Sequence, residues 1–478
     1  MFYFDSIENY HNYLAITPNG CSIAVKYYLE KINSNNHLNA FIEIFTDEAL
    51  ERAKCLDTKR KNGEVLGKLH GVVVTIKDVI CYKNHKVSAS SGMLKDFVSL
   101  YNSSAVENLI KEDAIIIGNC NCDEFAMGST NENSIYGRVL NFLDENKVPG
   151  GSSGGSAVAV QAGLCMASLG SDTGGSVRQP ADFCGIIGMK PTYGRISRNG
   201  LIAYASSFDQ IGIFSHRVED AALILSVING ADKFDSTVIQ EKVTGYLITK
   251  KRKKYKIALL KNALEHESLD PEIKIAIYSL ASRLKEEGHS LGEVDFGLID
   301  FIVPTYYVLT TAEASSNLSR YDGVRYGYRY ENDTDKLIEF YKKTRSNGFG
   351  KEVKRRIMLG TFVLSEGYYD AYFTKAQQIR KLLINQTKEI FKSFDAIILP
   401  TVPSTAFEAG SMQKDPIAMY LADIYTVYAN LTGTPAISLP LFKHTNGLPF
   451  GVQVITNNDN ELTLLEFSDQ LMRKFKSY

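Results

Sequence analysis

Two clusters of glycine and serine lie close together in the middle of the chain. The first is PGGSSGGS at residues 149–156, and the second lies within GSDTGGSVRQP at residues 170–180. Such clusters can cradle a phosphate at the start of a helix, or they can present a serine as a nucleophile. They can also be plain tight turns, because glycine tolerates a positive φ.

Motif spacing narrows these alternatives. A phosphate-binding loop needs G-x-x-x-x-G-K-[ST]; Gly150 and Gly155 have that spacing, but Ser156 stands where the lysine belongs. Neither cluster contains the dinucleotide pattern G-x-G-x-x-G. G-x-S-x-G occurs twice by overlap, yet none of the 8 histidines lies in a motif that would complete a hydrolase triad. The clusters alone therefore leave a tight turn as a full alternative.

A lysine upstream of the clusters favours a catalytic role over a plain tight turn. Lys77 follows the apolar run GVVVTI, and the order Lys77, Ser152, Ser176 resembles the Ser–cisSer–Lys triad of the amidase signature family. The matching segments are GVVVTIKDVI, DEFAMGSTNENS, VPGGSSGGSAVAV and GSDTGGSVRQPADFCGIIGMKPTYGR. The resemblance implies an α/β fold, a mixed central sheet with helices on both faces. It also implies one catalytic domain over residues 1–478, with both clusters at one end of the sheet.

The resemblance assigns a role to each triad residue. Ser176 is the expected nucleophile, and Ser152, in a cis peptide, relays a proton between Ser176 and Lys77. A lysine can act as the base when burial lowers its pKa, because the neutral form then becomes accessible. We expect this chemistry to cleave an amide.

The resemblance also implies an oxyanion site, and this chain departs from the family pattern at one turn. Backbone N–H groups of Thr173, Gly174 and Gly175 are expected to bind the oxyanion, and side chains at the two glycines would crowd that space. After Asn141 the family reads Pro-Trp-Asp, whereas this chain has Phe142–Asp144 with the sequence FLD. The departure puts the packing of that turn in question and leaves the triad unaffected.

Three further segments, at 304–327, 352–373 and 414–440, are similar to the glutaminase subunits of tRNA-dependent amidotransferases within this family. Glutamine would then be the amide donor, with an arginine binding its α-carboxylate and an aspartate its ammonium group. The expected pocket residues are Gly128, Ser129, Tyr307, Arg356 and Asp423.

The same similarity implies partners, the B and C subunits of such an amidotransferase. The B subunit, a kinase–transamidase, would use ATP and Mg²⁺ to activate Glu-tRNA(Gln), and the small C subunit would complete a heterotrimer. Asp-tRNA(Asn) stays open as a second acceptor, and this chain itself would need no cofactor.

Two alternatives to a glutaminase remain. One is a free-standing amidase acting on another amide, and the other is a phosphate- or nucleotide-binding module. Glutamine-dependent ammonia release tests the first, and ATP binding by the chain tests the second.

The elements that must position these residues follow an α/β alternation. Asp270 is a candidate N-cap, Pro271 suits a first helical position, and Gly288 suits a helix stop. The sequence predicts strands at 71–80, 114–119, 166–172 and 256–260, and helices at 104–113, 156–164 and 270–288. The segment 394–406 is interpreted as a late buried strand followed by a proline-rich turn.

The composition fits a soluble globular protein. Of 478 residues, 44% are hydrophobic and 22% charged, and the net charge of -1 argues against a surface that binds nucleic acid throughout. The start shows no secretory signal and the apolar runs are too short for a membrane span, so we expect a cytoplasmic protein.

The chain also contains seven cysteines and one strongly basic run. Seven scattered cysteines indicate reduced thiols, and the pair Cys120 and Cys122 lacks the further ligands of a metal site, so none is predicted. The run TKKRKKYK at 249–256 is interpreted as a solvated loop. Its alternative role is contact between the basic residues 250–254 and tRNA phosphates.

Overall fold

A computed structural model describes residues 2–241, 245–249, 253–331, 336–411 and 422–476. In this part of the chain, eleven strands form one mixed sheet in the order β1-β3-β2-β4-β6-β5-β10-β11-β9-β7-β8. The strands are β1 (Phe41–Ile44), β2 (Val73–Lys77), β3 (Ile115–Cys120), β4 (Ala167–Ser171), β5 (Ile187–Lys190), β6 (Ile211–Ser215), β7 (Lys256–Leu260), β8 (Ser290–Val294), β9 (Ala396–Pro400), β10 (Ala436–Lys443) and β11 (Pro449–Thr456).

Three parallel strands place Lys77 and the start of the second glycine-serine cluster at the same end of the sheet. β2 pairs in parallel with both β3 and β4, so the carboxyl ends of all three point the same way. β2 ends at Lys77, and β4 ends at Ser171, directly before the second glycine-serine cluster. Clefts outside the carboxyl ends of parallel strands are the usual ligand sites of α/β sheets.

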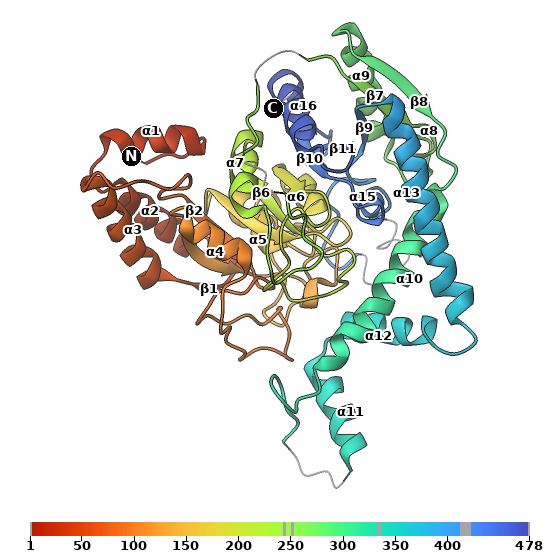
Figure 1. Ribbon diagram of the computed structural model, residues 1–478, viewed down its shortest axis with the longest axis horizontal. Helices are drawn as coiled ribbons and strands as arrows, with labels where there is room; N and C mark the ends of the chain where they lie inside the picture. Colours follow the sequence, from red (N-terminus) through yellow and green to blue (C-terminus); the bar gives the residue numbers. More distant parts are fainter. Residues whose placement is uncertain (1, 242–244, 250–252, 332–335, 412–421, 477–478) are drawn as a thin grey trace.

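Two groups of helices cover the sheet (Figure 1). Helices α5 and α6 contact each other and several central strands, whereas α4, α7 and α16 form a second group that contacts β3, β6, β10 and β11. The helices of the first half are α1 (Ile7–Ile16), α2 (Gly20–Ser34), α3 (Thr46–Lys61), α4 (Ser104–Lys111), α5 (Gly154–Gln161), α6 (Arg178–Cys184) and α7 (Val218–Ile228). Those of the second half are α8 (Lys261–Leu264), α9 (Pro271–Glu286), α10 (Ile299–Asn317), α11 (Leu337–Gly348), α12 (Lys351–Val363), α13 (Lys375–Ser393), α15 (Thr426–Thr432) and α16 (Glu461–Phe475).

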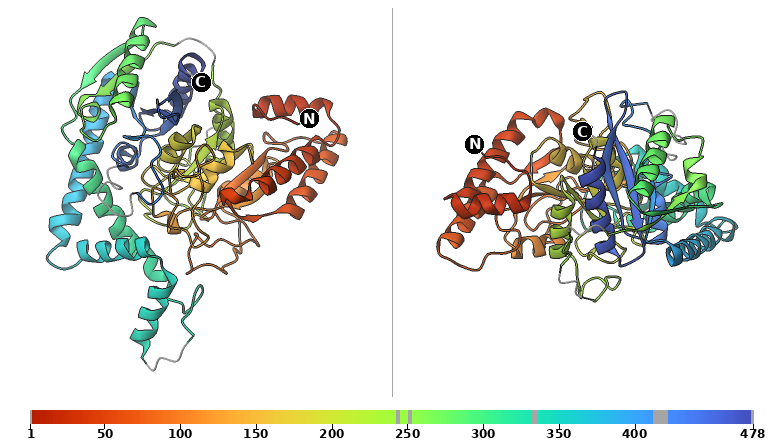
Figure 2. Two further views of the ribbon diagram at one scale, coloured as in Figure 1. Left: turned by 180° about the vertical axis from the view of Figure 1, so that it is seen from behind. Right: turned by 90° about the horizontal axis from the view of Figure 1, so that it is seen from above.

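Long helices close the side of the molecule opposite the N-terminal helices (Figures 1 and 2). α10 packs against α12, α13 and α15, while α11 projects away from the body. Helices α1 to α3 lie at the other end of the sheet, where α3 packs on β3. The second half of the chain thus supplies a wall of helices next to the sheet.

The elements predicted from sequence are confirmed. A strand or helix occupies each predicted range, and the α/β fold with a mixed sheet holds. Asp270 caps α9 by accepting the N–H of Glu272 at 2.8 Å, and Gly288, with φ +86°, follows its end. In the described part of the chain, no helix combines the length and apolarity that a membrane span requires.

The turn after Asn141 and the basic run at 249–256 were both noted in the sequence. Phe142 and Leu143 are exposed, and the turn is closed by Asn141, whose Oδ1 accepts the N–H of Leu143 at 3.0 Å. The departure from the family pattern therefore lies on the surface. Of the basic run, residues 250–252 lie outside the described residues, whereas Lys253 and Lys254 are exposed.

Candidate active site

Lys77 lies at the centre of a set of serine hydroxyls. Its Nζ is hydrogen-bonded to Ser152 Oγ at 2.7 Å, to Ser153 Oγ at 2.9 Å and to Ser171 Oγ at 2.9 Å. Ser152 and Ser153 come from the first glycine-serine cluster, whereas Ser171 ends β4 and leads into the second. The lysine thus joins two clusters that are separate in the sequence.

Burial sets the protonation of this lysine. Lys77 is completely buried, and burial lowers its pKa to about 8. The negative charges of nearby groups, including Asp123, Asp172 and Asp209, oppose that shift without cancelling it. A substantial fraction of Lys77 is therefore neutral near physiological pH.

The first cluster has the backbone that the triad hypothesis requires. The peptide bond between Gly151 and Ser152 is cis. The Gly151 N–H donates to Gln179 Oε1 at 3.0 Å, which ties the first cluster to the helix after the second. A Cβ at Gly151 would lie 2.2 Å from Asp123 Oδ2, and one at Gly155 would lie 2.3 Å from the Asn121 carbonyl oxygen. Glycine is needed here because neighbouring groups approach the backbone closely.

A buried ion pair holds the second cluster. Arg178 donates to Asp172 through Nε at 3.0 Å and through Nη2 at 2.9 Å, and neither residue is exposed. Although burial acts in the opposite direction, the Arg178 guanidinium holds the pKa of Asp172 well below its usual range. Asp172 also accepts the N–H groups of Gly175 and Val177. The loop that presents Ser176 is therefore fixed around one ionised carboxylate.

The expected oxyanion segment is tightly packed. A Cβ at Gly174 would lie 2.3 Å from Tyr306 Oη, and one at Gly175, where φ is +123°, would lie 2.2 Å from Thr426 Oγ1. The crowding that requires glycine thus comes from these two side chains. Because the Gly175 N–H donates to Asp172 at 2.9 Å, that group is already engaged.

Three other backbone N–H groups near Ser176 have no acceptor in the part of the chain that the structure describes. Within the described residues, the N–H groups of Thr173, Gly174 and Ser176 donate to no acceptor. Ser176 itself is partly exposed, unlike the buried residues around it. A substrate carbonyl can therefore meet both a hydroxyl and unused N–H donors at this point.

Two of the expected pocket residues, Ser129 and Tyr307, bind the carboxylate of a third, Asp423. Asp423 Oδ2 accepts from Ser129 Oγ at 2.9 Å and from Tyr307 Oη at 2.9 Å. Burial raises the pKa of Asp423 to about 6, against the effect of these two hydrogen bonds. Gly128 packs on Asp123, since a Cβ there would lie 2.3 Å from the Asp123 carboxyl carbon. At neutral pH Asp423 is mostly ionised and suits an ammonium group.

Arg356 completes this group from α12. It is buried, and its guanidinium carbon lies 5.4 Å from the ring centre of Tyr307. Its Nε donates to Glu352 Oε1 at 2.9 Å and its Nη1 donates to Tyr204 Oη at 2.9 Å. Among the described residues no acceptor binds Nη2, so part of the guanidinium is available to a carboxylate.

Several contact residues were not predicted from the sequence. Glu352 stands four residues before Arg356 in one helix, so helical spacing could have suggested that pair. Ser171 could have been inferred from its place at the end of a strand parallel to β2. Tyr204 gave no signal, because its contact with Arg356 spans 152 residues.

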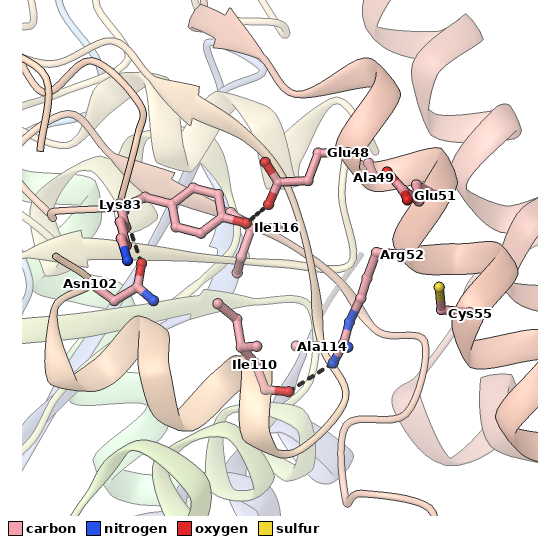
Figure 3. A pocket seen from close by; sticks show the side chains of 11 residues that line it. Glu48, Ala49, Glu51, Arg52, Cys55, Lys83, Asn102, Ile110, Ala114 and Ile116 are labelled. Atoms are coloured by element: carbon pink, nitrogen blue, oxygen red, sulfur yellow. Dashed lines mark hydrogen bonds between the residues drawn. The ribbon is translucent and has the colours of Figure 1, made fainter. Parts of the chain in front are cut away.

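A separate pocket lies between α3 and the loop after β2 (Figure 3). Its volume is about 390 Å³, and Arg52 reaches across it to donate to the Ile110 carbonyl at 2.8 Å. The exposed Cys55 lines it as well. It contains none of the predicted site residues. In the described residues, no group of three or more histidine, cysteine or acidic side chains is placed to hold a metal ion.

Comparisons with known proteins agree with this geometry. The family model described as Amidase matches residues 24–465. The chain is 47% identical to the A subunit of glutamyl-tRNA(Gln) amidotransferase from Chlorobium phaeobacteroides (strain BS1), over 98% of this chain and 99% of that protein. It is 49% identical to the same-named protein of Fusobacterium nucleatum, over 94% of this chain and 92% of the relative.

A solved structure extends the likeness to the fold. The crystal structure of the A subunit of glutamyl-tRNA(Gln) amidotransferase from Thermotoga maritima superposes with a TM-score of 0.82 at 37% identity, covering 99% of this chain and 96% of that one. The chain therefore belongs to the amidase family, as its Lys–Ser–Ser arrangement indicated.

Proposed function

We propose that this chain is the glutaminase subunit of a glutamyl-tRNA(Gln) amidotransferase, acting as one catalytic domain. The observation that carries the proposal is the buried Lys77, bonded to Ser152 of one cluster and to Ser171 at the base of the other. The similarity over nearly the full chain to proteins named as the A subunit of this amidotransferase supports the substrate.

The proposed reaction starts at Ser176. Its Oγ attacks the side-chain carbonyl carbon of glutamine, and its proton passes through Ser152 to neutral Lys77. Free N–H groups at Thr173 and Gly174 stabilise the oxyanion. The C–N bond then breaks, the leaving nitrogen takes the proton back through Ser152, and ammonia departs from a γ-glutamyl ester. Water hydrolyses that ester to glutamate by the same proton path.

The pocket selects glutamine by its two α groups. Arg356 binds the carboxylate through its open Nη2, and Asp423 binds the ammonium, held in place by Ser129 and Tyr307. Gly128 lets the backbone before Ser129 pack directly on Asp123. An amide that lacks these α groups loses both charged contacts, which distinguishes a glutaminase from an amidase of broader range.

Ser176→Ala tests the assignment directly. The variant should release no ammonia from glutamine and form no ester, whereas the natural protein quenched in acid should carry a γ-glutamyl group on the peptide containing Ser176. Mass spectrometry of the digested protein detects the adduct. Glutaminase activity that survives this change would refute the proposed nucleophile. Preference for another amide over glutamine would favour the free-standing amidase.

Amidation of tRNA is assigned to partners. The sequence has no phosphate loop with a lysine, so ATP- and Mg²⁺-dependent activation of Glu-tRNA(Gln) falls to the kinase–transamidase, the B subunit. The small C subunit completes a heterotrimer in the cytoplasm. Ammonia is mostly protonated near neutral pH, so it must reach that second site by an enclosed path.

The division of labour has its own test. The purified chain, supplied with glutamine, ATP, Mg²⁺ and Glu-tRNA(Gln), should make glutamate and no Gln-tRNA until the two partners are added. Gln-tRNA formed by the chain alone would contradict it. The same assay with Asp-tRNA(Asn) decides whether a second acceptor is used.

A further inference from the structure

A single carboxylate connects the loop of the proposed nucleophile with the proposed glutamine pocket. Asp209 lies just before β6 and is buried. Its Oδ1 accepts from Thr173 Oγ1 at 2.7 Å and from the Ala205 N–H at 3.1 Å, while its Oδ2 accepts the Tyr204 N–H at 2.9 Å. Thr173 belongs to one site and Tyr204 leads to the other.

The Tyr204 side of this link ends at Arg356. The phenol oxygen of Tyr204 accepts from Arg356 Nη1 at 2.9 Å and donates to Thr310 Oγ1 at 3.1 Å. Tyr204 is almost fully buried, and the guanidinium carbon of Arg356 lies 5.6 Å from the centre of its ring. The position of Arg356 therefore depends on Tyr204, and the backbone of Tyr204 depends on Asp209.

The Thr173 side ends at the oxyanion segment. Thr173 precedes Gly174, where a Cβ would lie 2.3 Å from Tyr306 Oη, so this backbone packs closely against the tyrosine. The hydroxyl of Thr173 is thus fixed to Asp209 while its own N–H, among the described residues, stays free for an oxyanion. A displacement of Asp209 would move this donor and the arginine together.

Both ends must act on one small molecule. In glutamine the α-carboxylate and the side-chain amide are separated by a short flexible chain, so the pocket must fix the distance between them. Misplacement of a reacting group by about 1 Å can cost roughly 100-fold in rate. A rigid connection between the carboxylate site and the oxyanion site answers that requirement.

We propose that Asp209 is a positioning residue that keeps Arg356 in register with the oxyanion segment at Thr173, so that binding the α-carboxylate places the amide for attack. This inference rests on the proposed glutaminase function. A carboxylate is suited to the role because both of its oxygens accept. An asparagine of the same shape accepts at one atom only, and its amide nitrogen would face an N–H donor.

Three single variants separate the two ends. Tyr204→Phe removes the contact with Arg356 and should mainly raise KM for glutamine, whereas Thr173→Val removes the contact with Asp209 and should mainly lower kcat. Asp209→Asn should do both, with kcat/KM reduced roughly 10- to 100-fold, the loss expected for a hydrogen bond to a buried charged group. A merely structural role would not divide the effects in this way.

A double-mutant cycle gives the decisive measurement. Because the ends act through one carboxylate, Thr173→Val combined with Tyr204→Phe should reduce kcat/KM by several-fold less than the product of the single effects. The matched control is Thr401→Val, a buried threonine whose hydroxyl contacts Ser438 instead, and its effect should multiply with that of Tyr204→Phe. If the effect of Thr173→Val with Tyr204→Phe on kcat/KM equals the product of the two single effects within about twofold, the proposal is wrong.

The proposed glutaminase function and the positioning role of Asp209 can be refuted separately. Thermal unfolding shows whether Asp209→Asn is folded, and the cycle decides even if it is not, because neither of its variants alters Asp209. If Ser176→Ala stays active, the proposed function is wrong. If Ser176→Ala is inactive and the cycle is multiplicative, only the positioning role of Asp209 is wrong.

Discussion

The pH dependence of glutamine hydrolysis should report the neutral fraction of Lys77. Burial lowers the pKa of this group from 10.5 to about 8. At pH 7 about one tenth of the protein then has a neutral Lys77, roughly 300 times more than for an ordinary lysine. We therefore expect kcat/KM to rise about tenfold per pH unit below pH 8 and to flatten as Lys77 becomes neutral, before the α-ammonium of glutamine loses its proton at still higher pH.

The assay measures glutamate formation from pH 6 to 10, because total glutamate does not depend on how ammonia is protonated. Lys77→Met should lose roughly 100- to 10,000-fold in rate and should lose the limb near pH 8. Lys190 is a second buried lysine, with its pKa lowered to about 7 by burial, but it donates to the carbonyls of Pro191 and Thr434. A limb that persists in Lys77→Met, or a flat profile in the natural protein, would refute the base assignment.

Folding stability gives an independent readout of the same shift. The folded-state pKa of Lys77 lies below the unfolded value, so between pH 8 and 10.5 the unfolded chain binds more protons and stability rises with pH. Below pH 8 the need to charge the buried Lys77 destabilises the folded state by about 3 kcal/mol, its full value. Relative to Lys77→Met, the free energy of unfolding should increase by about 2.5 kcal/mol between pH 7 and 10, measured by urea denaturation.

The remaining predictions concern the pocket. Arg356→Ala and Asp423→Asn should each raise KM for glutamine by roughly 10-fold or more, which is the loss expected when one hydrogen bond to a charged group is removed. Hydrolysis of butyramide, which lacks the α groups, should change less. Normal glutamine binding in both variants would contradict the assigned pocket. Because burial raises the pKa of Asp423 to about 6, KM should increase as the pH falls through 6 and the carboxylate is protonated; Asp423→Asn should abolish that dependence, and a KM unchanged from pH 7 to 5 would show that Asp423 does not bind the ammonium group.

The sequence was informative where the structure depends on local pattern. Apolar runs ending at Lys77 and Ser171 were recognisable as strands because buried parallel strands are continuous in hydrophobicity. The glycine-serine clusters were recognisable because close backbone approach leaves room for glycine alone, as the packing around Gly151 shows. The mixed sheet, and the pairing of Lys77 with Ser152, were predicted from the resemblance to the amidase signature family that these segments carry.

The supporting contacts depend on pairs that are distant in sequence. Asp209 contacts Thr173 across 36 residues and Tyr204 contacts Arg356 across 152. No periodicity or motif specifies such a pair, because each residue by itself resembles an ordinary core or surface residue. Only the assembled sheet and its wall of helices bring them within hydrogen-bond distance.

The hydrogen-bond arrangement around Lys77 can be satisfied by a neutral amine as well as by an ammonium group. Ser153 Oγ donates its proton to the Ser171 carbonyl oxygen at 3.1 Å, so toward Lys77 it can only accept. A neutral lysine has two N–H donors and one lone pair. If the two donors serve Ser153 and Ser171, the lone pair is directed at Ser152, 2.7 Å away. Ser152 can then give its proton to Lys77 only if it takes another, and in the proposed reaction the partly exposed Ser176 is the group that supplies it.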